Sequence, residues 1–201
     1  MVSVTDDVVE LFASVSEALA RATWALLNDD VALANAVVAA DRLFDQKTAA
    51  LEARVWCEIE KPADCRGSLR ELVPVLLILP ELERSADLAE HIASRACTSL
   101  GNQMTPTSRG IVQRMSEAAL ELWQAAGTAY ARGSTEDLEL HEADEELDIL
   151  HGRLTAEVAD GGMEPGVAAQ VTLLARFYER LGDHAVNLSR RIASLPSRER
   201  P

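Results

Sequence analysis

The sequence predicts an all-α protein of two tandem antiparallel three-helix bundles, six helices in all, related by a pseudo-twofold axis. Aromatic residues make up only 4% of the 201 residues, while Ala, Leu, Val and Glu dominate, and this composition favours helix over strand. Apolar residues recur at helical spacing between clear turn signals. The chain also repeats itself, because the pattern of residues 41–45 returns at 144–148. Together these observations predict paired helical units with short loops.

The first predicted bundle, residues 1–100, contains three helices. Asn28-Asp29-Asp30 ends the first, and a Lys-Pro turn at 61–62 ends the second. The third contains the apolar segment 72–79, whose composition also suits a buried strand. We reject the strand because it would have no partner elsewhere in this chain. We therefore expect helices over residues 4–27, 31–60 and 68–99.

The second predicted bundle, residues 106–195, follows a linker at 101–106. Arg132-Gly133-Ser134 and Asp160-Gly161-Gly162 are the turn signals inside it, and Pro165 marks the start of its last helix. Acidic residues after Thr135 suit the first turn of a helix, where the helix dipole favours negative charge. We expect helices over residues 107–131, 135–159 and 165–194.

Charge and hydropathy exclude several classes of protein. The formal net charge of −14 repels phosphate backbones, so we expect no nucleic-acid partner. No apolar run reaches the ~18 residues that a membrane span needs, and the N-terminus lacks the pattern of a secretory signal. Three cysteines match no zinc or redox spacing, and we expect buried free thiols. The sequence thus predicts a soluble cytoplasmic protein.

Paired acids recur in register in the two halves, and they are the candidate site. Each pair has i, i+4 spacing, so its two side chains share one helix face. Apolar residues border the first three pairs, which places these acids on or beside core-facing surfaces, whereas Glu179 and Asp183 lie roughly opposite the main apolar stripe of the last helix. The candidate metal ligands are Asp41, Asp45, Glu83 and Asp87 in the first half and Asp144, Asp148, Glu179 and Asp183 in the second.

Three interpretations of these acids are open. They could hold a metal ion, because hard oxygen ligands suit iron, manganese, magnesium or calcium. They could pair with the neighbouring arginines at positions 42, 84, 176 and 180, or they could be solvated at a bundle edge. Repetition of all four pairs favours metal binding. The two Glu-x-x-His pairs of a di-iron bundle do not occur, and Asp148-x-x-His151 is the nearest match.

The sequence resembles the PhoU family. Residues 173–187 resemble the C-terminal signature of that family, residues 82–87 resemble its N-terminal copy, and residues 68–70 resemble the approach to its third helix. The first half departs from the family pattern in three places: Ser85-Ala86 stands where the second half has Leu181-Gly182, His91 takes the position of Asn187, and Pro80 stands just before Glu83. The resemblance implies two tandem three-helix bundles.

The resemblance to the PhoU family also implies function. It implies metal clusters, usually of iron or zinc, on Glu/Asp-x-x-x-Asp motifs. It implies an accessory regulator that links a phosphate ABC transporter ATPase to a sensor histidine kinase and represses the phosphate-starvation response. Such a protein would reach the membrane only through its partners, and we expect a homodimer.

Two classes of function therefore remain open. The first is a signalling adaptor of the phosphate system, a non-enzyme that binds proteins and metal. The second is a metal-dependent enzyme or metal-storage bundle that uses the same acids. The sequence shows no Gly-rich phosphate loop, no Ser-His-Asp or Cys-His signature and no candidate nucleophile, which favours the adaptor.

Overall fold

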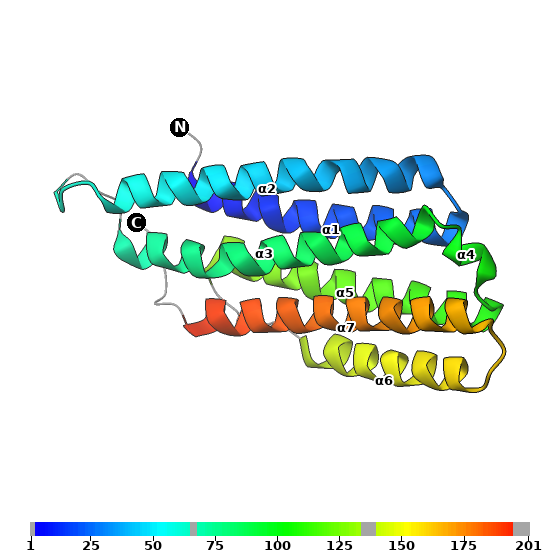
Figure 1. Ribbon diagram of the computed structural model, residues 1–201. Helices are drawn as coiled ribbons and strands as arrows, with labels where there is room; N and C mark the ends of the chain where they lie inside the picture. The colour runs from blue at the N-terminus through cyan, green and yellow to red at the C-terminus, as the bar shows by residue number, and fades with distance from the viewer. Residues whose placement is uncertain (1–2, 65–67, 134–139, 195–201) are drawn as a thin grey trace.

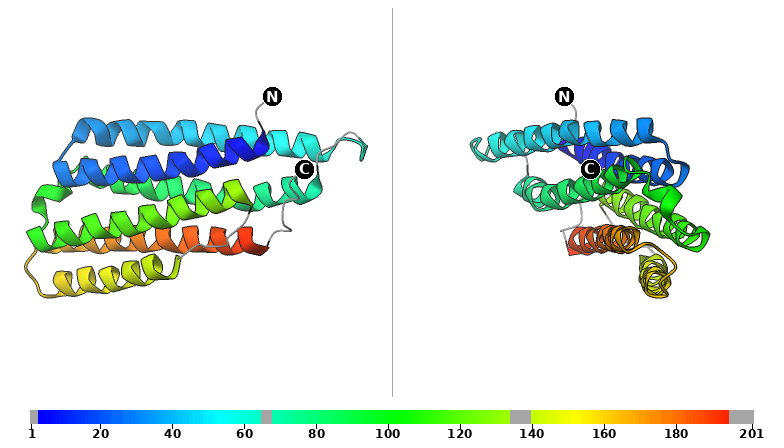
Figure 2. Two further views of the ribbon diagram at one scale, coloured as in Figure 1. Left: turned by 180° about the vertical axis from the view of Figure 1, so that it is seen from behind. Right: turned by 45° about the vertical axis from the view of Figure 1, so that its right-hand side comes forward.

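The computed structural model describes residues 3–64, 68–133 and 140–194, and over these residues the protein is all-α, with seven helices and no strand (Figure 1). Figure 2 shows the six long helices lying side by side along one common direction. The helices are α1 Val4–Asn28, α2 Val31–Ile59, α3 Leu69–Ala96, α4 Leu100–Gln103, α5 Pro106–Arg132, α6 Leu140–Ala159 and α7 Pro165–Ser194.

Local side chains set several of the helix ends. Asp29 adopts a left-handed conformation with φ 55° and ends α1, and the Asp30 side chain then accepts a hydrogen bond from the Leu33 N–H to begin α2. Thr105 caps α5 in the same way, with Pro106 at its first position. Gly133, with φ 67°, ends that helix. Turn signals in the sequence therefore predicted these boundaries for identifiable physical reasons.

The helices pack in two groups of three. In the first group α1, α2 and α3 contact one another, and in the second α5, α6 and α7 do so. Contacts of α1 with α5 and of α3 with α7 join the groups. Each of these contacts pairs one helix with its counterpart in the repeat, as the predicted pseudo-twofold requires.

The core is continuous between the two groups. Phe12 of α1 lies between Trp123 and Tyr130 of α5, with ring centroids 5.8 Å from each. Buried hydroxyls also cross the interface, because Thr23 bonds to Tyr178 at 2.6 Å and accepts from Ser116 at 3.0 Å. Burial raises the pKa of the Tyr178 hydroxyl, which therefore stays protonated. These bonds satisfy the buried hydroxyls of Thr23, Ser116 and Tyr178.

Three expectations about the elements need correction or comment. Residues 100–103 of the predicted linker form the short helix α4, because Ser99 is left-handed (φ 54°) and the bare Cα of Gly101 packs on the Leu26 carbonyl. The Arg109 side chain holds this turn through a 2.6 Å bond to the Gly101 carbonyl. Residues 72–79 lie within α3, so the rejection of a strand is confirmed. The predicted start of a helix at 135 lies outside the described residues.

The expectation of buried thiols is wrong for the described cysteines. Cys57 is exposed, because it lies on the outer face of α2, and Cys97 is half-buried at the end of α3. Among the described residues, no helix combines the length and hydropathy needed to cross a membrane.

Candidate metal centre

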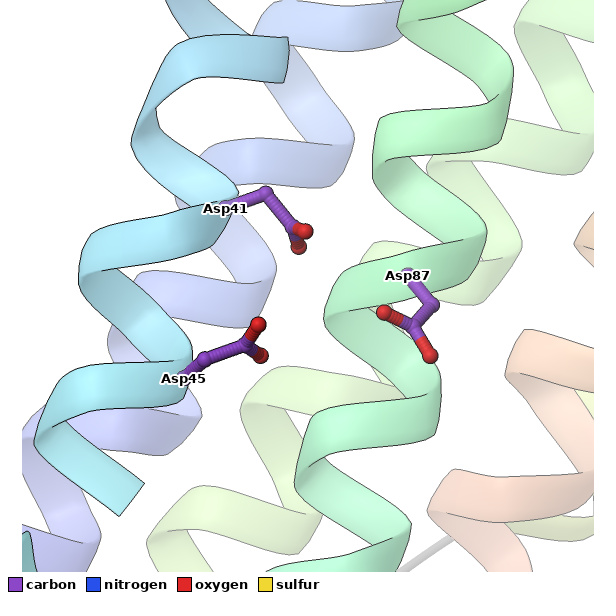
Figure 3. A group of neighbouring side chains, drawn as sticks. All are labelled: Asp41, Asp45 and Asp87. Carbon is purple, nitrogen blue, oxygen red and sulfur yellow. The ribbon is translucent and has the colours of Figure 1, made fainter. Parts of the chain in front are cut away.

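Asp41, Asp45 and Asp87 converge between α2 and α3 (Figure 3). One carboxylate oxygen from each lies within 4.8 Å of the others, and no other three His, Cys, Asp or Glu side chains among the described residues meet this limit. Asp41 and Asp45 share a face of α2 through their i, i+4 spacing, and Asp87 faces them from the antiparallel helix α3. The arrangement presents three carboxylates to one point.

Asp41 carries a polar atom with no partner. Its Oδ1 is buried and makes no hydrogen bond, although the residue as a whole is only half-buried. A buried carboxylate oxygen without a donor is unfavourable unless a proton or a cation satisfies it. The other two aspartates are exposed, so a solvated ion can reach the cluster.

The electrostatics of the cluster favour uptake of positive charge. Burial raises the pKa of Asp41 to about 6, and the neighbouring carboxylates of Asp45, Asp87 and Glu90 add to this rise. The pKa of Asp87 is also raised, chiefly by burial and to a smaller extent by the negative charge of Asp45. Within the described residues, no ion pair involves any of the three aspartates. Pairing with arginine therefore does not explain this half of the repeat.

Glu83, the fourth predicted ligand of the first half, lies apart from the three aspartates. The fully buried Thr48 donates a 2.5 Å hydrogen bond to its Oε1. The nearby Arg84 forms its ion pair with Glu81, at 3.6 Å, rather than with the three aspartates. One oxygen of Glu83 thus has a protein partner already, which distinguishes it from Asp41.

The second half presents its acids differently. Burial raises the pKa of Asp144, and Asp148 and Asp183 raise it further, so these three carboxylates are electrostatic neighbours. Arg190 lowers the same pKa by partial neutralisation. Glu179 forms an ion pair with Arg176 at 2.5 Å. The four acids of this half do not supply three ligand atoms within the 4.8 Å limit.

A groove beside Asp41 gives the cluster an open approach. It has a volume of about 210 Å³ and lies between α1, α2 and α3, with Phe44 and Glu90 in its wall. Of the three aspartates only Asp41 lines this groove, and Arg21 and Lys47 line it too. The cluster itself offers carboxylate oxygens, which suit hard divalent or trivalent cations. The residues present therefore fit a metal ion in the first half.

Comparison with known proteins agrees with this architecture. The family model for the PhoU domain matches residues 8–96 and 112–192. A phosphate-specific transport system accessory protein PhoU homolog 1 from Mycobacterium leprae is 32% identical over 179 residues, which cover 87% of this chain and 81% of the relative. A PhoU homolog 2 from Mycobacterium tuberculosis is also 32% identical, over 87% of this chain and 84% of its own length.

Solved structures share the fold. A crystal structure of PhoU from Pseudomonas aeruginosa superposes with a TM-score of 0.85 at 22% identity, over 96% of this chain and 94% of that one. The phosphate transport system regulatory protein PhoU from Streptococcus pneumoniae gives a TM-score of 0.80 at 19% identity, over 96% and 92%. At these identities the likeness establishes the arrangement of the helices.

Proposed function

Because the chain belongs to the PhoU family, we propose that it is an accessory regulator of phosphate uptake and of the phosphate-starvation response. One observation carries this proposal: both halves match the PhoU domain, and relatives at 32% identity are named accessory proteins of the phosphate-specific transport system. The relatives are named as accessory and regulatory proteins, not as enzymes. We further propose that residues 1–100 and 106–195 are the two repeat units.

The mode of action that we propose is an adaptor in the cytoplasm. The protein would bind the ATPase of a phosphate ABC transporter and a sensor histidine kinase, and would hold the kinase in its repressing state while phosphate is imported. A homodimer would present two copies of each binding surface. Large apolar side chains stand exposed on the long helices, among them Trp24 and Trp56, and such residues are typical of surfaces that contact other proteins.

The metal part of the proposal concerns the three aspartates of the first half. Asp41, Asp45 and Asp87 would hold a divalent or trivalent ion, an iron or zinc ion in the family's usual pattern. Bound there, the ion supplies positive charge that offsets the repulsion of three carboxylates. Asp41 and Asp45 would thereby be tied to Asp87, which fixes α2 against α3 and sets the shape of the surface offered to partners.

A genetic test with a biochemical arm examines this function. The gene is deleted in its host, and a reporter of the phosphate-starvation response is measured at high phosphate. We expect the reporter to be active in the deletion strain and silent again when the gene is restored. We also expect the tagged protein to retain the transporter ATPase on purification. A silent reporter in the deletion strain, together with no retained ATPase, would refute the adaptor role.

A further inference from the structure

We propose that two copies of this chain dock against each other through an apolar face formed by the end of α2 and the start of α3. The apolar face consists of Trp56, Leu69, Val73, Leu76, Leu77 and Pro80. The inference rests on the homodimer proposed above, and it adds the surface through which the homodimer forms.

The start of α3 is apolar on every side. Residues 72–80 are nine apolar residues in succession, and none of them has a charged or hydrogen-bonding side chain. Five of these side chains are buried, but Val73 is 44% exposed, Leu77 is 53% exposed and Pro80 is exposed as well. A helix segment that is apolar all round is normally buried on all sides. The outward side of this segment therefore lacks the cover that its composition calls for.

Trp56 extends the exposed apolar surface from α3 onto α2. It follows Asp45 by eleven residues, or three helical turns, so both side chains leave the face of α2 that borders α3. The two helices are antiparallel (Figure 1), and the bond between Thr48 and Glu83 sets their register. Continued along both helices, this register places Trp56 level with Leu76. A half-exposed tryptophan beside a row of aliphatic side chains is typical of the centre of a protein interface.

The second half of the repeat shows that the fold itself does not require this apolar surface. The alignment of residues 41–45 with 144–148 and of 82–87 with 178–183 gives the equivalent positions. The counterparts of Trp56, Val73, Leu76 and Pro80 are Ala159, Ala169, Thr172 and Arg176, all of them exposed. Small and polar residues thus suffice at these places in the same helices. The large apolar residues of the first half are better explained by a contact that only this half makes.

The charges along the two edges of the apolar face fit a second copy of the chain. Glu52 and Glu60 are exposed along the α2 edge. Arg70 and Arg84 are exposed along the other edge, where Arg191 of α7 donates to the Leu77 carbonyl at 3.4 Å. A twofold axis that runs parallel to α3 brings the acidic edge of each copy against the basic edge of the other. The apolar face is therefore complementary to itself.

A membrane surface fits the same residues less well. The chain has a net charge of −14, and anionic lipid headgroups repel such a protein. Glu52 and Glu60 also stand at the edge of the apolar face, where they would meet those headgroups. A second copy, in contrast, supplies arginines to these acids.

Sedimentation equilibrium of the purified full chain tests the proposal. Val73→Glu/Leu77→Glu puts two carboxylates per copy into the contact, at exposed positions where the helix tolerates them. Ala169→Glu/Leu173→Glu is the matched control, because it adds the same charge at the equivalent exposed positions of the second half. We expect the first variant to raise the dissociation constant of the dimer by at least about 30-fold, and the control by less than about threefold. Circular dichroism checks that both variants keep their helices.

A second pair of variants tests the contribution of α2. Trp56→Ala removes the aromatic side chain from the apolar face, and we expect the dissociation constant of the dimer to rise about tenfold or more. Trp24→Ala is its control, since Trp24 is similarly exposed but lies on α1. The control should dimerise as wild type does. Equal effects of the two substitutions would count against the apolar face.

Every other outcome overturns the proposal in a recognisable way. If wild type is a dimer and Val73→Glu/Leu77→Glu dimerises as tightly, another surface forms the homodimer, and only this inference is wrong. If wild type is a monomer, the homodimer itself is wrong, while the adaptor role still stands or falls by the reporter. Loss of transporter ATPase or of phosphatidylserine vesicles from Val73→Glu/Leu77→Glu, with its oligomeric state unchanged, would assign the apolar face to that partner instead.

Discussion

Leu147 of α6 packs directly on the backbone of Gly182 in α7. A Cβ added at Gly182 would collide with Leu147 Cδ2 and lie 3.3 Å from Leu122 Cδ1. The missing side chain is therefore what allows α6 and α7 to approach beside Asp183. Leu147 is therefore the side chain that occupies the space beside Gly182.

Gly182→Ala tests this contact. We expect the free energy of unfolding to fall by about 1–3 kcal/mol, because Leu147 must leave its position or α6 must move outward. Gly152→Ala is the control: it lies within α6 with open space around it, and alanine there should leave stability unchanged or raise it by up to about 1 kcal/mol. Urea denaturation measures both. Equal stability of the two variants would contradict the packing described.

Ser85→Ala tests the polar contact between the two halves. Ser85 Oγ lies 3.0 Å from His184 Nδ1 and donates to the Glu81 carbonyl at 2.6 Å, in a fully buried position. Removal of the hydroxyl leaves the buried imidazole without this partner, so we expect a loss of about 1–2 kcal/mol in the free energy of unfolding. Ser14→Ala is the control, since the Ser14 hydroxyl bonds only within its own helix. A stability equal to that of the control would show that the contact is dispensable.

The raised pKa of Asp41 predicts how stability depends on pH. In the folded protein this carboxyl has a pKa of about 6, compared with 3.8 for the unperturbed group, so the folded state takes up a proton that the unfolded chain does not. The ionised form is thus destabilising above pH 6, and the penalty disappears as the pH falls from about 7 toward 4. Because the group is half-exposed, solvent screening limits the effect to about 1 kcal/mol.

The measurement compares chelator-treated wild type with Asp41→Asn by urea denaturation at several pH values. We expect wild type to gain stability relative to the variant as the pH is lowered through 6. The variant cannot titrate at this position, so other groups cancel in the difference. The account would be contradicted if this stability difference did not change with pH or changed in the opposite direction. Burial and the neighbouring carboxylates would then not raise the pKa of Asp41.

The sequence predicted the long helices and the acid pairs because both depend on local spacing. Turn residues such as Asp30 and Gly133 cap the helix at their own position in the chain, so the sequence alone indicates these helix boundaries. The short helix at 100–103 was missed because it depends on the packing of Gly101 on the Leu26 carbonyl, a contact between distant parts of the chain.

The difference between the two acid sites could not be predicted in the same way. Spacing alone treats Glu83 and Glu179 as equivalents. The register of α2 against α3 places Thr48 beside Glu83, whereas Glu179 pairs with Arg176 three residues earlier on its own helix. For the same reason the sequence offered no means of seeing that Asp41 would keep an unsatisfied buried oxygen.

The central claim is that Asp41, Asp45 and Asp87 hold a metal ion, and a thermal melt with added Zn²⁺ tests it most directly. At a Zn²⁺ concentration of 100 times the dissociation constant, binding stabilises the folded state by about 2.7 kcal/mol, which corresponds to a rise in Tm of about 5–10 °C. We predict this rise for wild type and for the second-half variant Asp144→Asn/Asp148→Asn, and its loss in Asp41→Asn/Asp45→Asn and after chelation. A rise that persists in the first-half variant, or that disappears only in the second-half variant, would contradict the claim.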